Sequence, residues 1–84
     1  PKPTLPLAGY AGEYADPGYG ASKVTVEGGR LVWAWSSFNC TLEPYDRDTF
    51  RVTDGRFADE VIEFRVRNGT ADALRAVGVV FTRK

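Results

Sequence analysis

Hydrophobic and polar residues alternate with a period of two along most of the chain, which is the pattern of half-buried β-strands. The clearest case is residues 23–35. Two alternating runs, 23–27 and 30–35, are separated by Gly28-Gly29, a dipeptide typical of a two-residue hairpin turn. The pattern predicts an antiparallel hairpin whose apolar face carries Val24, Val26, Leu31, Trp33 and Trp35.

Two further strands are predicted in the middle of the chain. Residues 49–53 alternate and end at Asp54-Gly55, a turn signal. Residues 60–67 alternate cleanly and end at Asn68-Gly69, another hairpin dipeptide. In the second strand the inward positions are Ile62, Phe64 and Val66.

The remaining strands have weaker patterns. Residues 74–82 read as one apolar, β-branched strand, in which Gly78 indicates a bulge or a close backbone approach. A short strand is predicted around residues 10–14. Another is predicted over residues 39–45, interrupted or ended at Pro44.

No segment has a sustained helical pattern, and only one helical turn is expected, over residues 5–10. About seven to eight short strands in 84 residues predict an all-β fold, a small antiparallel β-barrel. The proline-rich residues 1–6 are interpreted as a linker, and residues 7–84 as a single barrel domain. Closure removes the sheet edges that promote aggregation. The interior is expected to be filled by Trp33, Trp35, Phe50, Phe64 and Phe81.

Charge and composition exclude several classes of function. The 11 Lys and Arg residues balance the 11 Asp and Glu residues, so the chain lacks the basic footprint of a nucleic-acid or membrane-surface binder. The longest uncharged apolar stretch, residues 76–81, is far shorter than a membrane-spanning helix requires. Because the chain has no His, a His-based triad and a His metal site are both absent.

The other candidates for chemistry favour structural roles. Cys40 has no His to activate it and is expected to be a buried, inert thiol. Asp46 and Asp48 flank Arg47, and such carboxylates in a turn are usually solvated or cap backbone amides. Their spacing does not supply a calcium loop. The sequence therefore predicts no catalytic residues, no metal and no cofactor.

Asp16-Pro17-Gly18 reads as a type II turn, with Pro17 and Gly18 at its central positions. This interpretation predicts a positive φ at Gly18. It also predicts that the Tyr19 ring packs on the end of the barrel, with its hydroxyl hydrogen-bonded or wet.

Two pairs of aromatic residues are candidates for binding. Tyr10, Tyr14, Tyr19 and Tyr45 carry hydroxyls that prefer a wet or hydrogen-bonded end, and at a barrel mouth they would offer a docking surface. Of these four, Tyr19 and Tyr45 are the candidate binding residues. Trp33 and Trp35 are either core residues or the lining of a ligand cavity. Core is favoured, because so small a barrel is usually filled by its own side chains.

Several segments resemble an accessory domain found at the C-terminus of serine hydrolases of the penicillin-binding-protein and class C β-lactamase type in bacteria and archaea. The Pro-Gly-Tyr-Gly element is the most specific of them. One departure is that the family often carries histidines before Asp-Thr-Phe, where this chain has residues 43–47 without any. The matching segments are Leu7 to Tyr14, Pro17-Gly18-Tyr19-Gly20, Gly29-Arg30-Leu31, Asp48-Thr49-Phe50 and Phe81-Thr82-Arg83.

The resemblance implies a lipocalin-like barrel without catalytic residues of its own. It implies an upstream serine hydrolase domain in the same chain, in a parent protein that is periplasmic or secreted. The expected roles are packing on the catalytic domain, shaping access to it, or mediating homo-oligomer contacts. The alternative hypothesis is a barrel that binds an apolar small molecule between Trp33 and Trp35.

Overall fold

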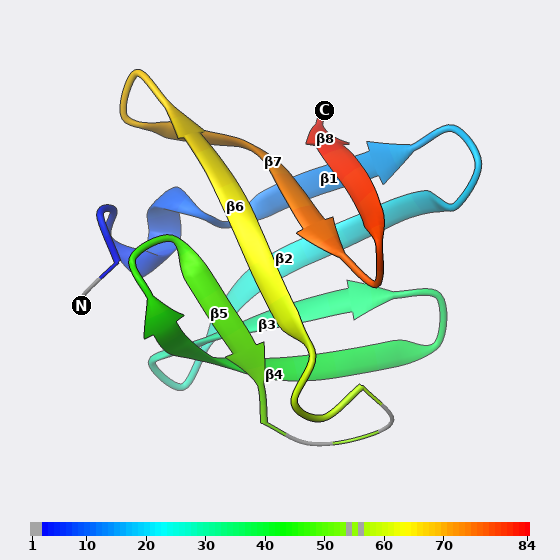
Figure 1. Ribbon diagram of the computed structural model, residues 1–84, viewed down its shortest axis with the longest axis horizontal. Helices are drawn as coiled ribbons and strands as arrows, with labels where there is room; N and C mark the ends of the chain where they lie inside the picture. Colours follow the sequence, from blue (N-terminus) through cyan, green and yellow to red (C-terminus); the bar gives the residue numbers. More distant parts are fainter. Residues whose placement is uncertain (1–2, 54, 56) are drawn as a thin grey trace.

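The computed structural model describes residues 3–53, 55 and 57–84. Its strands follow one another around a closed antiparallel barrel, and β8 pairs with β1 to complete it (Figure 1). The predicted all-β barrel of about seven to eight strands is confirmed. The elements are η1 (Leu7–Gly9), β1 (Gly12–Asp16), β2 (Gly20–Glu27), β3 (Arg30–Trp35), β4 (Phe38–Asp46), β5 (Thr49–Val52), β6 (Val61–Arg67), β7 (Thr70–Ala76) and β8 (Val79–Arg83).

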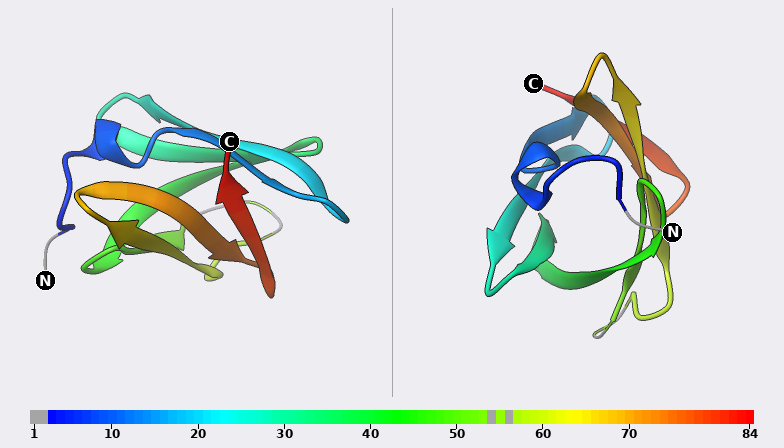
Figure 2. Two further views of the ribbon diagram at one scale, coloured as in Figure 1. Left: turned by 90° about the horizontal axis from the view of Figure 1, so that it is seen from above. Right: turned by 90° about the vertical axis from the view of Figure 1, so that its left-hand side faces the viewer.

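Successive turns alternate between the two ends of the barrel, because each strand runs antiparallel to the one before it. One end, here the η1 end, carries η1 and the β2–β3, β4–β5 and β6–β7 turns. The other, here the aromatic end, carries the β1–β2, β3–β4 and β7–β8 turns and the β5–β6 loop. Seen along the barrel in the right-hand view of Figure 2, the strands form a ring and the N-terminal segment crosses its η1 end.

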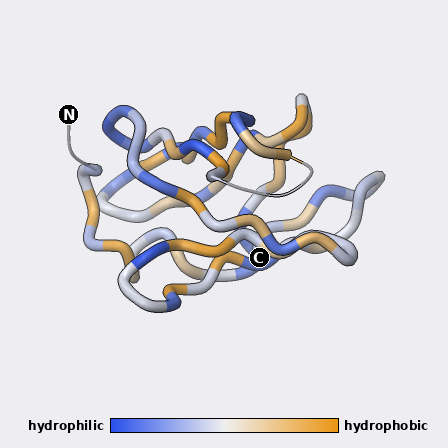
Figure 3. The backbone as a smooth tube through the Cα atoms, turned by 90° about the horizontal axis from the view of Figure 1, so that it is seen from below, coloured by the Kyte–Doolittle hydropathy of each residue, from blue (hydrophilic) through white to orange (hydrophobic). Residues whose placement is uncertain are grey.

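Side chains alternate between the interior and the outer face along each strand, and hydrophobic and hydrophilic stretches alternate along the backbone in Figure 3. Trp33, Phe50 and Phe81 are almost completely buried, as predicted, and Phe64 is buried as well. Trp35 is only partly buried and packs on the rim of this core. The largest buried side chains are Tyr10, Tyr14, Trp33, Phe50, Phe81, Leu31, Leu42, Ile62, Leu74, Val24 and Val52.

The prediction of one strand over residues 74–82 is wrong. Val77-Gly78 forms a two-residue hairpin turn between β7 and β8, with φ of 47° and 77° at the two residues. Such a turn needs positive φ at both central residues, which favours Asn or Gly at the first position. A valine there gives no turn signal, so the apolar run conceals the reversal and Gly78 is a turn residue rather than a bulge.

Strand β4 does not end at Pro44 but continues to Asp46. Its register with β5 shifts between Pro44 and Asp46. Proline lacks an N–H and is tolerated at such an irregularity in the pairing. Of the predicted turn at 54–55, Asp54 lies outside the described residues.

The predicted positive φ at Gly18 is also wrong. Positive φ occurs instead at Gly20, at 87°. One carboxylate oxygen of Asp16, Oδ2, accepts hydrogen bonds from the backbone N–H groups of Gly18 at 2.8 Å and Tyr19 at 2.9 Å. The turn is therefore held by an aspartate side chain, a local bond that competes with a type II turn.

The single predicted helical turn is present as the 3₁₀ helix η1. The residues before it contact the barrel: Leu5 packs against the core, and Thr4 bonds to the β4–β5 turn. Within the described part of the chain, no helix is long and apolar enough to cross a membrane.

Candidate functional site

Four aromatic side chains from separate turns and strand ends gather at the aromatic end of the barrel. Tyr19 lies in the β1–β2 turn, Trp35 ends β3, Phe38 begins β4, and Phe57 lies in the β5–β6 loop. The ring centroids of Phe38 and Phe57 are 4.9 Å apart in an edge-on arrangement. The Trp35 ring lies 6.1 Å from Tyr19 and 6.3 Å from each phenylalanine. We call these four residues the aromatic cluster.

The aromatic cluster is continuous with the core below it but open to solvent above it. Trp35 stacks on the buried Trp33 with ring centroids 5.8 Å apart. Its other neighbour in the core is Phe81, at 6.1 Å. Tyr19 is 56% exposed, and the other three members are partly exposed. Aromatic rings that are fixed from below and solvated above are typical of interaction surfaces.

Trp35 is held in place by a hydrogen bond as well as by packing. Its indole Nε1–H donates to the backbone carbonyl of Tyr19 at 3.0 Å. The bond joins the end of β3 to the β1–β2 turn. It fixes the orientation of the indole in advance, so little side-chain entropy remains to be lost when a partner covers the ring.

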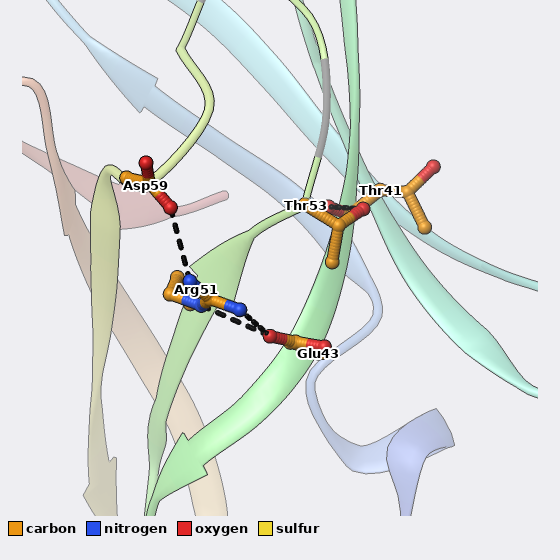
Figure 4. Close-up of polar contacts among 5 residues, drawn as sticks. All are labelled: Thr41, Glu43, Arg51, Thr53 and Asp59. Atoms are coloured by element: carbon orange, nitrogen blue, oxygen red, sulfur yellow. Dashed lines mark hydrogen bonds and ion pairs between the residues drawn. The ribbon is translucent and has the colours of Figure 1, made fainter.

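The β5–β6 loop that carries Phe57 is tied to the barrel by polar contacts (Figure 4). Arg51 on β5 forms ion pairs with Glu43 on β4 and, at 3.0 Å, with Asp59 in the loop. The hydrogen bond with Glu43 is the main reason that the pKa of Arg51 is raised. Thr53 donates from both its backbone N–H and its hydroxyl to the carbonyl of Thr41, at 2.9 and 3.2 Å.

The opposite end is closed by a polar network that is structural. Asp48 Oδ1 accepts hydrogen bonds from the Tyr10 hydroxyl at 2.6 Å and the Thr4 hydroxyl at 2.5 Å. The Tyr10 oxygen in turn accepts from the backbone N–H of Leu5 at 3.2 Å. Asp48 thus caps the incoming chain, in agreement with the structural role predicted for the Asp46 and Asp48 carboxylates.

These contacts shift the pKa values of both Tyr10 and Asp48. Burial is the largest effect on Tyr10, and with the hydrogen bond to Asp48 it raises the pKa of the phenol. For Asp48, burial alone would raise the pKa. Hydrogen bonds from Thr4 and Tyr10 and the charge of Arg47 outweigh it, so the pKa of this carboxyl lies below its usual value.

A second part of the network joins the two ends of the chain. The Arg83 Nη2 donates to the carbonyl of Ala11 at 2.8 Å and to the Tyr14 hydroxyl at 3.2 Å. Its guanidinium also lies 5.3 Å from the centroid of the Tyr14 ring. Gly12 has φ of 147°, and a Cβ there would meet Arg83 Cζ at 3.2 Å. The absence of a side chain at Gly12 makes room for the arginine.

The two tyrosines of the network at the η1 end are held as neutral hydrogen-bonding groups. Tyr10 and Tyr14 are fully buried, and burial raises the pKa of Tyr14. A phenol that is buried and raised in pKa stays neutral at physiological pH and serves as a hydrogen-bonding group. Within residues 3–53, 55 and 57–84, no group of three or more carboxylate, thiol or imidazole side chains could hold a metal ion.

Three of the four binding candidates from the sequence meet at one end. Trp35 contacts both Tyr19 and Trp33. Tyr45, by contrast, lies near the end of β4, at the η1 end, and is 60% exposed. For a ligand ring to fit between Trp33 and Trp35, the two indole planes would have to be about 7 Å apart, which is twice the usual distance between atoms in contact. Their centroids are 5.8 Å apart. The two indoles contact each other, so this arrangement leaves no room for a ligand between them.

Phe38 and Phe57 were not singled out by the sequence. Phe38 has a detectable signal, because Ser36-Ser37 is a two-residue connection that pairs Trp35 with Phe38. Phe57 lies in a polar loop, and nothing in its local sequence indicates that the loop folds back onto Trp35.

The family model of a domain of unknown function, DUF3471, matches residues 1–82, and the chain therefore belongs to this family. Comparison with curated proteins gave no match, and comparison with solved structures gave none either. The family description carries no activity, so the function has to be argued from the geometry above.

Proposed function

We propose that this DUF3471 domain is a non-catalytic accessory module of a β-lactamase-related serine hydrolase, and that it packs on the catalytic domain through the aromatic cluster. Docked there, it shapes access to the catalytic domain. The observation that carries the proposal is the set of Tyr19, Trp35, Phe38 and Phe57 at one end of a closed barrel.

The aromatic cluster has the composition of an interface centre. Tyrosine and tryptophan are enriched among residues that carry binding energy, and phenylalanine is enriched at interfaces in general. Trp35 is already oriented by Tyr19, and the loop bearing Phe57 is already anchored through Arg51. A surface ordered in advance loses less conformational entropy on association.

A non-catalytic role is supported by how the polar side chains of the η1 end are used. Asp48, Tyr10, Tyr14 and Arg83 are committed to bonds that close the barrel. Tyr10 and Asp48 hold the incoming chain, and Tyr14 and Arg83 join the first and last strands, so these polar groups have structural partners.

The link to a serine hydrolase rests on the resemblance of the sequence motifs. Pro17-Gly18-Tyr19-Gly20, the most specific of them, forms the β1–β2 turn that presents Tyr19 to the aromatic cluster. A motif placed at the candidate interface supports a role in docking. Two other matching segments, Leu7 to Tyr14 and Phe81-Thr82-Arg83, meet instead where Arg83 contacts Gly12 and Tyr14, which supports a role in the fold.

The test uses the full-length protein that contains this domain and compares hydrogen exchange with that of the isolated 84-residue chain. We expect the amides of residues 18–20 and 36–39 to be protected in the full-length protein. The variant Tyr19→Ser should reduce that protection. Tyr45→Ser is the matched control, because Tyr45 is similarly exposed but lies at the other end.

Three results would contradict the proposal. Equal exchange in both proteins would mean that the aromatic cluster is not covered. Protection that grows with the concentration of the isolated chain would assign the surface to contacts between copies. If the parent sequence has no Ser-x-x-Lys and Tyr-x-Asn motifs of a serine hydrolase upstream of this domain, the assignment to a serine hydrolase is wrong.

A further inference from the structure

A pocket of about 310 Å³ opens at the η1 end, away from the aromatic cluster. It lies between η1, the β2–β3 turn and the neighbouring parts of β4 and β5. Its apolar lining comes from Leu7, Leu31, Leu42 and Phe50. Leu7 is partly exposed, whereas the other three belong to the buried core, so the pocket leads from the surface down to the top of the core.

Two charged residues, Arg30 and Glu43, also line this pocket, but only Glu43 has a partner of opposite charge. Glu43 accepts hydrogen bonds from both Nε and Nη2 of Arg51 on the neighbouring strand. Arg30 is exposed and forms no ion pair or side-chain hydrogen bond with any residue that the structure describes. The pocket therefore combines an apolar lining with one uncompensated cation.

We propose that this pocket binds a small organic carboxylate, with its apolar body against Leu7, Leu31 and Leu42 and its carboxylate on the Arg30 guanidinium. A guanidinium presents paired N–H donors that match the two oxygens of a carboxylate. At about 30 Å³ per water-sized group, the volume accommodates about ten non-hydrogen atoms. This inference is independent of the docking proposed for the aromatic cluster, since it concerns the opposite end.

The test is an NMR titration of the ¹⁵N-labelled chain with octanoate, which has ten non-hydrogen atoms, and with octanamide, its uncharged isostere. We expect octanoate at millimolar concentration to shift the amides of residues 29–31 and of Leu42 and Glu43 in a saturable way. Octanamide should bind about tenfold more weakly, because it lacks the charge that Arg30 recognises.

Two variants assign the effect to Arg30. Arg30→Gln should reduce octanoate binding about tenfold, to the level of octanamide. Arg47→Gln is the matched control, an exposed arginine at the same end that does not line the pocket, and it should leave binding unchanged. Because Arg30 is exposed, its replacement leaves the core intact, and the spectrum of the variant reports its folding directly.

Each of four results would overturn the proposal. These are no saturable shift with octanoate, equal affinity for octanoate and octanamide, unchanged octanoate affinity in Arg30→Gln, and shifts centred on residues 18–19 and 35–38 instead of the pocket. The last would assign octanoate to the aromatic cluster.

Discussion

Replacing Gly12 by alanine tests the junction between the first and last strands. Gly12 has φ of 147°, and an added Cβ would meet Arg83 Cζ at 3.2 Å and both terminal nitrogens at 3.3 Å. The neighbouring atoms are the charged end of a side chain that donates to Ala11 and Tyr14. The alanine must therefore strain the backbone and also push the guanidinium from its acceptors.

The two effects have separate magnitudes. An L-residue in this sparsely populated region costs about 1–3 kcal/mol. Losing a hydrogen bond from a charged donor costs about 1.5–3 kcal/mol. Together we expect a loss of about 2.5–6 kcal/mol. For 84 residues, the total stability expected is about 4–13 kcal/mol, so the variant should be severely destabilised but measurable at low temperature.

The assay is urea unfolding of four proteins: wild type, Gly12→Ala, Arg83→Met and the double variant. If the clash with Arg83 is real, Gly12→Ala should cost less in the Arg83→Met background, by about 1.5–3 kcal/mol. Gly69→Ala is the matched control, because Gly69 has φ of 76° and nothing lies within 4 Å of its added Cβ. It should cost only about 1–2 kcal/mol. Equal losses for Gly12→Ala and Gly69→Ala, or full additivity in the cycle, would refute the reasoning.

Three further predictions concern the same fold. The pKa of Asp48 is lowered on folding, so its contribution to the free energy of unfolding is fully present above about pH 4 and is lost as the pH falls through the folded-state pKa. In urea unfolding, the stability advantage of wild type over Asp48→Asn should therefore shrink between pH 6 and pH 2. A difference that stays constant over this range would contradict the prediction. Val77→Asn relieves the strain of a β-branched residue at φ of 47° but loses the packing of Val77 against the core, so it should raise stability by less than about 1 kcal/mol, and a lower melting temperature would contradict this. Gly20→Ala should cost about 1–2 kcal/mol, because Gly20 has positive φ; Gly18→Ala should cost less, because its added Cβ meets only the far end of the Asp16 side chain at 3.3 Å, and a larger loss for Gly18→Ala in thermal unfolding would contradict this.

Within the aromatic cluster, the sequence identified Tyr19 and Trp35 but neither Phe38, which begins β4, nor Phe57. Trp35 follows from the alternation of residues 30–35, and Tyr19 from its position after Pro17-Gly18. Phe57 depends on where a long loop folds back, which is decided by Arg51, Asp59 and backbone bonds such as that from Asp59 N–H to the Val52 carbonyl. None of these contacts has a periodic signature.

The sequence by itself determined the class of fold, most of the strands and several core positions, among them Trp33, Phe50, Phe64 and Phe81. These follow from local rules: side chains in a strand alternate with a period of two, and Gly-Gly or Asn-Gly permits positive φ in a hairpin turn. The same rules failed where a residue took a conformation contrary to its preference. Val77 at positive φ concealed a turn, and the Asp16 side chain replaced a turn that Gly18 would have made.

Only the tertiary structure decided what closes the barrel and what remains open. The bond between Tyr10 and Asp48 joins residues 38 apart in the chain, and the bond from Arg83 to Ala11 joins residues 72 apart. The pairing of β1 with β8 brings Gly12 and Arg83 together, and the position of η1 leaves a pocket beside Arg30. Local propensity fixes backbone direction over a few residues, whereas such contacts arise only when the whole ring of strands closes and buries its common core.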